Sequence, residues 1–349
     1  MSAVSSLERE IQQQPEAIRR LLRAETDRLA ELGARWAARD DIHALLLAGR
    51  GTSDNAARYA QYVFGAHNRL QVALATPSLF THYARPPSLA GFLVGAISQS
   101  GRSPDIVSVI AEARRQHRPT VVVTNEGSSP LAAASDAVVL LHAGTEHAVA
   151  ATKTYTSSLA AIAAMSLAHT PAPDRSAQLA SMPERVAEAI DRAWTDVTIP
   201  DWLSDAQACV VVGRGFNYAT AFETALKLKE LTGIAAEPYS SADLLHGPVA
   251  AVSWRTPVVL IAPSGEVARD LGSVAARLRE RGARLVVVSD DQALLASADL
   301  PLSLPSGVPE WLSALTAVIP GQVLAWRLAE ARGLDVDRPE GLAKVTETR

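Results

Sequence analysis

The sequence contains two copies of one pattern, and this repeat constrains the fold more than any other feature of the chain. HALLLAGRGTSDNAARYA (43–60) resembles ACVVVGRGFNYATAFETA (208–225), and GFLVGAISQSG (91–101) resembles RTPVVLIAPSG (255–265). Gly49 precedes Gly213 by the same number of residues as Gly101 precedes Gly265. Two pairs of corresponding glycines with the same separation in the sequence predict a duplicated domain.

Each half contains about five short apolar runs with helical patterns between most of them. Runs that are apolar throughout, rather than alternating, are typical of strands buried on both faces of a sheet. Alternation of strand and helix then predicts an α/β fold with a doubly wound parallel sheet in each half. The runs lie near 43–48, 71–75, 92–97, 120–124 and 137–141 in the first half, and near 208–212, 234–237, 257–262, 284–289 and 299–304 in the second.

Composition excludes several classes of protein. Hydrophobic residues make up 48% of the 349 residues, which is enough for two packed cores. The net charge of −4 gives no electrostatic footprint for nucleic acid. Cys209 is the one cysteine, so neither an internal disulfide nor a cysteine-based zinc site can form.

The N-terminus lacks an apolar secretory region, and the most apolar helical stretch, near 159–168, is too short to cross a membrane. We therefore expect a cytoplasmic protein.

The chain divides into four predicted parts. Residues 1–35 have a helical pattern, and 36–180 and 190–333 form the two repeated domains. The stretch PAPDRSAQLASMP (171–183) is polar and contains prolines, which is typical of a boundary. Residues 334–349 have no apolar periodicity and are expected to form an extended tail that lies on another part of the protein.

Polar turns follow two strands of the first half. Gly49–Asn55 follows the first strand and Ser98–Ser103 the third, and a helical pattern follows each turn. Ligands of open parallel sheets bind at the carboxyl ends of the strands, where N–H groups, hydroxyls and helix N-termini suit a phosphate. Ordinary polar turns are the alternative. The corresponding loop of the second half, 262–265, has one hydroxyl fewer and a proline, so we expect the phosphate in the first half.

Nucleotide and hydrolase motifs are missing. GxGxxG fails at Asp54, and no GxxxxGK[ST], GxSxG or HExxH pattern occurs in the sequence. The ligand predicted for these turns is therefore a small phosphorylated metabolite rather than a nucleotide.

Three features of the second half and the tail offer chemistry. Glu223, Lys227 and Glu230 share one face of a predicted helix, although a solvated, salt-bridged face would show the same spacing. His246 precedes a turn at Gly247-Pro248. Lys344 lies in the tail, where a lysine is ordinarily solvated.

Taken together, these segments resemble the SIS (sugar isomerase) family. The resemblance is close to the isomerase half of glucosamine-6-phosphate synthase and, in architecture, closer to stand-alone SIS-type glucosamine-6-phosphate deaminases. It implies two tandem SIS domains, each a flavodoxin-like five-stranded parallel sheet, and a homodimer. The matching segments, in the family's order, are EIQQQPEAI, GRGTS, ISQSGRSPD, AGTEHAVAATKTYT, ALKLKE, LLHGP and DVDRPEGLAKVT.

The resemblance implies a role for each matching residue. In the family, the glutamate of KLKE, here Glu230, moves a proton between C1 and C2 of the sugar. The histidine of HGP, here His246, opens the sugar ring from the partner subunit, and the lysine of LAK, here Lys344, closes over the substrate. No metal or redox cofactor is needed. The remaining matches are Ser53, Ser98, Gln99, Ser100 and Ser103 for the phosphate, and Thr52 and Val149 for the sugar pocket.

Departures from the synthase pattern bear on the reaction. Arg102 replaces an acidic residue and Ala151 replaces the usual serine, and no cysteine lies near the start where the synthase has its glutaminase nucleophile. Arg102 and Ala151 bear on the identity of the substrate. The chain is expected to lack the N-terminal glutaminase domain of the synthase, and this favours release of ammonia, from glucosamine 6-phosphate to fructose 6-phosphate. Another aldose–ketose phosphosugar isomerase, a fructosamine-phosphate deglycase, an N-acetylamino-sugar phosphate dehydratase and a sugar-phosphate sensor without turnover are the alternatives.

Overall fold

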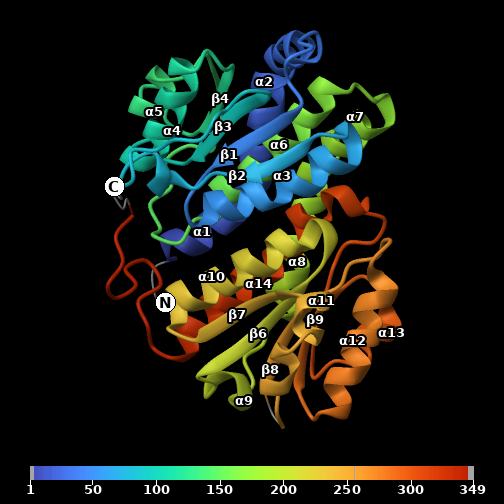
Figure 1. Cartoon of the computed structure of the whole chain (residues 1–349). Helices are drawn as coiled ribbons and strands as arrows, with labels where there is room; N and C mark the ends of the chain where they lie inside the picture. Colours follow the sequence, from blue (N-terminus) through green and yellow to red (C-terminus); the bar gives the residue numbers. More distant parts are fainter. Residues whose placement is uncertain (1–3, 255, 345–349) are drawn as a thin grey trace. The chain divides into compact units, whose positions relative to one another are not determined.

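The computed structural model describes residues 4–254 and 256–344, which form two compact units (Figure 1). We call them the N-terminal and C-terminal units. The N-terminal unit comprises Glu16–Glu146, Lys153–Ser181 and the chain from Ala343. The C-terminal unit comprises the chain up to Pro15, His147–Thr152 and Met182–Leu342. The first helix and the segment after Glu146 thus belong to the unit that is built mainly from the second half of the chain.

The N-terminal unit contains a five-stranded parallel sheet in the order β2-β1-β3-β4-β5. This order is the flavodoxin-like arrangement that the family resemblance implies, and it confirms the doubly wound parallel sheet predicted from the apolar runs. The strands are β1 (Ala44–Ala48), β2 (Gln71–Leu74), β3 (Phe92–Ser98), β4 (Thr120–Thr124) and β5 (Ala137–Leu140). The helices are α2 (Gln14–Ala37), α3 (Thr52–Asn68), the 3-10 turn η1 (Pro77–Leu79), α4 (Pro104–Arg115), α5 (Pro130–Ala133), α6 (Lys153–His169) and α7 (Pro173–Ala180).

Both faces of this sheet are covered, which explains its continuously apolar strands. Val94 and Ala96 of β3 pack against α4, whose buried Ile106, Val109 and Ile110 recur at helical spacing. The alternate residues of each strand point to the opposite face, where α3 contacts β1, β2 and β3.

The polar stretch 171–183, which its composition marks as a boundary, contains the step from one unit to the other between Ser181 and Met182, and much of it is helical. It contains α7, and Leu179 of this helix is buried. Its apolar residues pack on neighbouring helices, and that packing determines the local structure more than the prolines do, since Pro173 occupies the first turn of the helix, where proline is tolerated. The domain limits 36–180 and 190–333 stay a prediction.

The C-terminal unit contains a second parallel sheet in the order β10-β9-β8-β6-β7, the same topology as the first. The duplicated fold predicted from the repeat is therefore confirmed. The strands are β6 (Ala208–Gly213), β7 (Ala235–Ser240), β8 (Pro257–Ile261), β9 (Arg284–Ser289) and β10 (Leu300–Ser303). The helices are α1 (Ser6–Gln12), α8 (Met182–Asp196), α9 (Asp201–Ser204), η2 (Gly215–Asn217), α10 (Tyr218–Thr232), α11 (Ser241–Leu245), η3 (Pro248–Ala251), α12 (Ala268–Glu280), α13 (Gln292–Leu295), η4 (Glu310–Leu312) and α14 (Ser313–Ala331).

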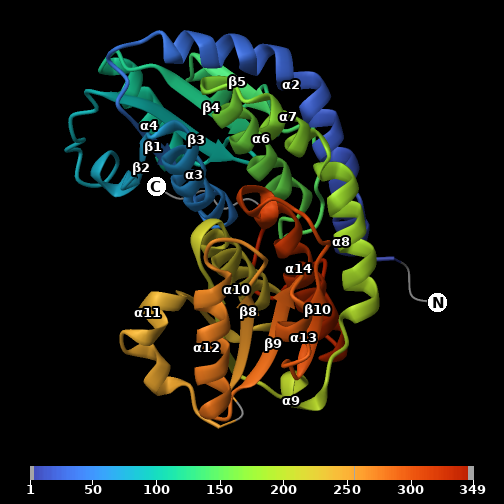
Figure 2. The ribbon, with the colours of Figure 1, turned by 90° about the vertical axis from the view of Figure 1, so that its right-hand side faces the viewer.

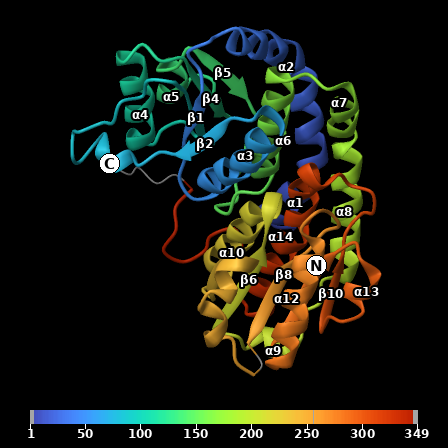
Figure 3. The same ribbon diagram turned by 45° about the vertical axis from the view of Figure 1, so that its right-hand side comes forward.

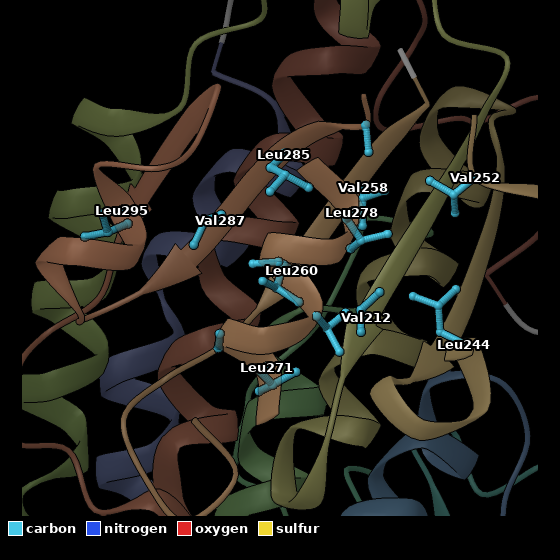
Figure 4. Close-up of a cluster of buried hydrophobic side chains, with 14 residues drawn as sticks. Val212, Leu244, Val252, Val258, Leu260, Leu271, Leu278, Leu285, Val287 and Leu295 are labelled. Carbon is cyan, nitrogen blue, oxygen red and sulfur yellow. The ribbon is translucent and has the colours of Figure 1, made fainter. Parts of the chain in front are cut away.

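A core of aliphatic side chains fixes α12 on this sheet (Figures 2 and 4). Leu271 and Leu278 of α12 pack against Leu260 of β8 and Val287 of β9, and all four side chains are buried. Burial of one such side chain stabilises the fold by about 1.5–3 kcal/mol, so this cluster holds the sheet rigidly.

Helix α10 packs closely on α14 at a small residue. A Cβ on Gly321 would come within 2.5 Å of Thr224 Oγ1, so the two helices approach each other more closely than a larger residue would allow. Residues 310–331, which include α14, are apolar enough to cross a membrane, but 94% of their most apolar window is buried inside the protein, as in a core helix. Within the described residues, 310–331 is thus the segment that is long and apolar enough to cross a membrane, rather than 159–168.

Candidate active site

The predicted phosphate loops follow neighbouring strands of the N-terminal unit. All five residues of β1 pair with β3 in parallel, so the β1–α3 and β3–α4 turns both leave the sheet at its carboxyl edge, from neighbouring strands. In this strand order the chain reverses its winding between β1 and β3, which is where open α/β sheets bind ligands. Thr52 and Ser53 open α3, Ser98 ends β3, and Ser103 is the N-cap of α4.

Glycine gives the β1–α3 turn its shape. Gly51 is the N-cap of α3 with φ of 53°, a conformation that other residues rarely adopt. A Cβ on Gly49 would lie 2.8 Å from the carbonyl carbon of Ser53. Because only hydrogen fits there, the strand end can approach the first turn of α3 closely, and the N–H groups and hydroxyls of that turn lie at the sheet edge.

Backbone contacts also fix the β3–α4 turn. The Gly101 N–H donates to Ser98 Oγ at 3.1 Å, and the Asn125 N–H donates to the Gln99 carbonyl at 3.2 Å. Ser98 is buried, and Ser103 makes no capping bond with its hydroxyl. The Ser98 hydroxyl thus shapes the turn, whereas the Ser103 hydroxyl has no capping role in α4.

An ion pair that sequence reasoning missed joins the two turns. Nε and Nη2 of Arg50 lie 2.8 and 2.7 Å from Asp105 Oδ2. The Asp105 side chain is completely buried, whereas that of Arg50 is half exposed. Both residues lie in the segments GRGTS and ISQSGRSPD, so their motifs were visible, but their contact depends on the pairing of β1 with β3.

A cavity of about 490 Å³ lies beside the β3–α4 turn. It brings together three of the predicted residues, Gln99, Ser100 and Lys344. Thr52, Ser53, Ser98 and Ser103 are not among its lining residues. The other residues that line it are Arg102, Asn125, Glu126, Gly127, Leu140, His142, Gly144, Thr145 and Glu146.

Lys344 is held inside this unit by a buried carboxylate. Its Nζ lies 2.9 Å from Oε2 of Glu146, a side chain with no exposed surface. Glu146 also accepts hydrogen bonds from Thr154, from the N–H at 3.1 Å and from the hydroxyl at 2.7 Å. The carboxylate therefore anchors the first turn of α6 and the tail lysine together. Lys344 thus does not have the fully solvated position that is ordinary for a lysine in a tail.

The residues that line the cavity include both acidic and basic side chains. Hydrogen bonds from Ser128 lower the pKa of Glu126, and the nearby Arg102 guanidinium adds to this effect. Arg102, which departs from the synthase pattern, thus places a positive charge among the lining residues, close to where Lys344 places another.

A larger cavity, of about 750 Å³, lies elsewhere in the same unit and is rich in arginine. Arg35 lies in the last turn of α2 and Arg114 in that of α4, where cations offset the partial negative charge of the free carbonyls. Arg114 also pairs with Asp136, and Arg39 pairs with Asp41. The helix ends and these ion pairs explain the arginines of the larger cavity without a ligand. We therefore place the candidate site at the smaller cavity, beside the β3–α4 turn.

In the C-terminal unit, α10 holds three charged side chains in a nearly dry environment. Lys227 Nζ lies 2.5 Å from Glu230 Oε2 and 3.4 Å from Glu223 Oε1. The side chains of Lys227 and Glu223 are 1% and 0% exposed, and that of Glu230 is 23% exposed. The alternative interpretation of the sequence, in which these three residues form a solvated, salt-bridged face of the helix, is therefore wrong.

The charge of Lys227 depends on its two partners. Burial opposes the charged ammonium, but the nearby Glu223 and Glu230 outweigh this effect and raise the pKa of Lys227. Lys227 thereby fixes the orientation of the Glu230 carboxylate. Sequence reasoning recognised the spacing but did not include Lys227 among the site residues.

His246 and Val149 are the other predicted residues of this unit. His246 directly follows α11 and is exposed, and Gly247 with φ of 148° turns the chain into η3. Val149 lies in the segment 147–152, which contains neither helix nor strand and is half-buried at this residue.

Comparisons with known proteins agree with this architecture. A glutamine–fructose-6-phosphate aminotransferase (isomerizing) from Leifsonia xyli subsp. xyli is 32% identical over 97% of this chain, which matches 58% of that protein. This chain spans about half the length of the curated relatives it matches. A protein from Silicibacter pomeroyi DSS-3, provisionally named a phosphosugar isomerase, superposes with a TM-score of 0.86, at 31% identity over 96% of this chain and 100% of that one.

A glucosamine-6-phosphate deaminase from Thermotoga maritima shares the fold, with a TM-score of 0.80 and 23% identity over 99% of this chain and 100% of that one. The SIS domain family matches residues 41–168 and 202–330, one segment in each copy of the repeat. With a parallel five-stranded sheet in each copy and these two matches, the chain belongs to the SIS domain family.

Proposed function

We propose that this protein is an amino-sugar phosphate deaminase/isomerase that converts glucosamine 6-phosphate and water to fructose 6-phosphate and ammonia. The observation that most supports this proposal is the Glu230 carboxylate, partly exposed and held by a buried lysine. A general base needs a fixed direction and access to its substrate, and this pair provides both. Membership of the SIS family supports the broader class of phosphosugar isomerases.

The phosphate would bind to the two turns of the N-terminal unit. Ser100 and Gln99 line the cavity there, and Ser53 and Ser103 lie in the first turns of α3 and α4. Each hydrogen bond to a charged phosphate oxygen contributes about 1.5–3 kcal/mol, so a few of them are enough for a small substrate. Thr52 and Val149 would then contact the sugar.

The reaction begins with ring opening, which exposes the aldehyde at C1. His246, donated by the partner subunit of a homodimer, would transfer the proton between the ring oxygen and the anomeric hydroxyl. Glu230 would then remove the proton from C2 and return it to C1, which converts the aldehyde and amine into a hydroxymethyl group and an imine. A second proton passes from the amine nitrogen to the C1 oxygen in this conversion. Water then adds to the imine carbon to form a carbinolamine, and its collapse to the ketone breaks the bond between carbon and nitrogen and releases ammonia. Lys344 would stabilise the negative charge that develops on the C1 oxygen.

The single cysteine of the chain gives no support to glutamine as a nitrogen source. Cys209 lies on β6 and is buried, and burial raises the pKa of its thiol to about 12. Hydrolysis of glutamine by a cysteine needs a thiolate at neutral pH. The buried Cys209 thiol is therefore unsuited to that role.

The test is to incubate the protein with glucosamine 6-phosphate without glutamine and to measure ammonia and fructose 6-phosphate. Equal amounts of both products would support the deaminase. Ketose formed only from an unaminated aldose phosphate would instead support a plain isomerase, and release of an amine from a fructosamine phosphate would support a deglycase. Elimination from an N-acetylated substrate would support a dehydratase, and tight binding without any product would support a sensor.

Substitution of Glu230 tests whether its carboxylate is the general base of the proposed reaction. We expect Glu230→Gln to bind glucosamine 6-phosphate nearly as well as the wild type but to lose turnover. Glu237→Gln, an exposed glutamate on the adjacent β7, is the matched control and should retain the wild-type rate. A near-normal rate for Glu230→Gln would remove this residue from the mechanism.

A further inference from the structure

The segment 147–152 has no regular structure of its own, yet Val149 lies in it. Without a helix or a ladder of strand hydrogen bonds, the backbone N–H and C=O groups of this segment need partners from elsewhere in the protein or from water. Ala148 and Ala150, on either side of Val149, have no exposed surface. The course of this segment is therefore determined by the part of the C-terminal unit that packs against it.

A buried carboxylate from α1 binds this backbone directly. The Oε1 atom of Glu10 accepts the His147 N–H at 2.5 Å, and Oε2 accepts the Ala148 N–H at 3.1 Å. The Glu10 side chain belongs to a residue that is 3% exposed. Burial of a carboxylate is costly unless it is hydrogen-bonded, and bonds to an ionised acceptor are stronger than neutral ones. Both oxygens of Glu10 thus bind the two residues that precede Val149.

Helix α1 is too short to be stable alone, and the C-terminal segment holds its start. The Ser6 and Leu7 N–H groups donate to the two carboxylate oxygens of Asp337, at 2.9 and 3.0 Å. At the same end, Ser5 Oγ accepts the Glu8 N–H at 3.1 Å. Leu7 is buried, and α1 contacts α14 (Figure 3). Asp337, which belongs to the predicted tail 334–349, thus binds the start of α1. Residues 345–349 of that prediction lie outside the described residues.

We propose that Glu10 is a positioning residue for the sugar pocket and that α1 connects the C-terminal segment at Asp337 to the backbone before Val149. This inference rests on the proposed function, in which Val149 contacts the sugar. If the C-terminal segment leaves α1, the helix loses its cap, and the carboxylate of Glu10 no longer holds the substrate segment. Placement of the tail and formation of the pocket are thereby coupled through one helix.

The test compares Glu10→Gln with Glu8→Gln. Both glutamates are on α1, but Glu8 is partly exposed, and its carboxylate does not contact the segment 147–152 in the hydrogen bonds described. The first readout is hydrogen exchange at the His147 and Ala148 amides. Loss of a charge-assisted acceptor should speed exchange at these amides by about tenfold or more in Glu10→Gln, with no change in Glu8→Gln.

The second readout separates substrate binding from turnover. With glucosamine 6-phosphate, Glu10→Gln should raise KM by about tenfold with a smaller change in kcat, as expected when the loss is in binding. Unchanged exchange at both amides would overturn the proposal, as would faster exchange with an unchanged KM. If the wild type does not turn over this sugar, the proposed function fails, whereas the exchange result still decides whether Glu10 holds the segment.

Asp337→Asn tests the connection through α1 without altering Glu10. We expect faster exchange at the Ser6 and Leu7 amides and, to a smaller extent, at His147 and Ala148. Faster exchange confined to Ser6 and Leu7 would show that α1 does not couple the two sites. This variant also replaces Glu10→Gln as the test if the latter does not fold.

Discussion

Lys344 Nζ and Glu146 Oε2 lie 2.9 Å apart in a cavity that Gln99 and Ser100 also line. The carboxylate is completely buried and the ammonium is about one-quarter exposed. A residue of the C-terminal tail is thereby attached to the N-terminal unit beside the predicted phosphate loops. This contact gives the tail lysine a defined place before any substrate binds.

The first prediction concerns this pair. Glu146→Gln removes the charge that holds Lys344, and a hydrogen bond to a charged group contributes about 1.5–3 kcal/mol. We expect kcat/KM for glucosamine 6-phosphate to fall by about 10–100-fold. Lys344→Ala should cause a similar loss, and the double variant should be no worse than the poorer single variant. Glu31→Gln, an exposed glutamate of α2, is the control. Fully additive losses would show that the two residues act separately.

The phosphate loops provide the second prediction. Ser98→Ala together with Ser100→Ala should raise KM by roughly two orders of magnitude or more, since two hydrogen bonds to an anion are lost. Ser100→Ala alone should raise KM less, because Ser98 also accepts the Gly101 N–H that shapes the turn. Ser108→Ala, whose hydroxyl donates to the Asp105 carbonyl on α4, is the matched control. A KM unaffected in the double variant would place the phosphate elsewhere.

The third prediction concerns the ion pair between the two turns. Arg50→Met leaves the buried Asp105 carboxylate without its guanidinium, and an unsatisfied buried acceptor costs about 1–3 kcal/mol. Chemical denaturation should show a loss of this size in the free energy of unfolding, and KM should rise as the turns separate. Arg114→Met removes a more exposed pair with Asp136 and should cost about 1 kcal/mol or less. Equal losses in both variants would contradict a special role for Arg50.

Lys227 gives a prediction about pH. Its folded-state pKa is raised above the ordinary value of 10.5, so its contribution to stability is complete below that pH and is lost as pH rises through the folded pKa. The free energy of unfolding of the wild type should therefore fall in alkaline solution above about pH 10.5. This alkaline loss should be smaller in Lys227→Met.

At neutral pH, Lys227→Met should be destabilised by about 3–5 kcal/mol, because the buried Glu223 carboxylate loses the positive charge beside it. Lys229→Met removes an exposed lysine from the same helix and should leave both stability and its pH dependence unchanged. An unaltered alkaline profile in Lys227→Met would mean that another group titrates there.

The proposed donation of His246 by a partner subunit is tested by mixing inactive variants. Hybrid dimers of Glu230→Gln and His246→Ala contain one intact site only if the two residues of each site come from different subunits. Random exchange of subunits should then restore about a quarter of the wild-type activity. If both residues come from one subunit, each site keeps a defect and the mixture stays inactive.

Local patterns in the sequence were enough to predict the duplicated parallel sheets. Continuous apolar runs such as those around Leu46 and Val259 indicate strands buried on both faces, and their alternation with helices indicates parallel sheets. The order of the strands came from the family resemblance. The glycines and hydroxyls of the two turns are also local features. Because such features depend on near neighbours in the chain, they are visible without a structure.

Contacts between distant residues were decided only by the tertiary structure. The sequence left open whether the face with Glu223, Lys227 and Glu230 carries chemistry or is a solvated, salt-bridged face, because periodicity does not report what covers a helix. The packing of other elements around α10 buries Lys227. The sequence offered no signal that Arg50 pairs with Asp105 or that Glu10 binds the backbone before Val149. The apolar pattern of the chain determines which elements form, but the direction and burial of each charged side chain depend on the elements that pack around it.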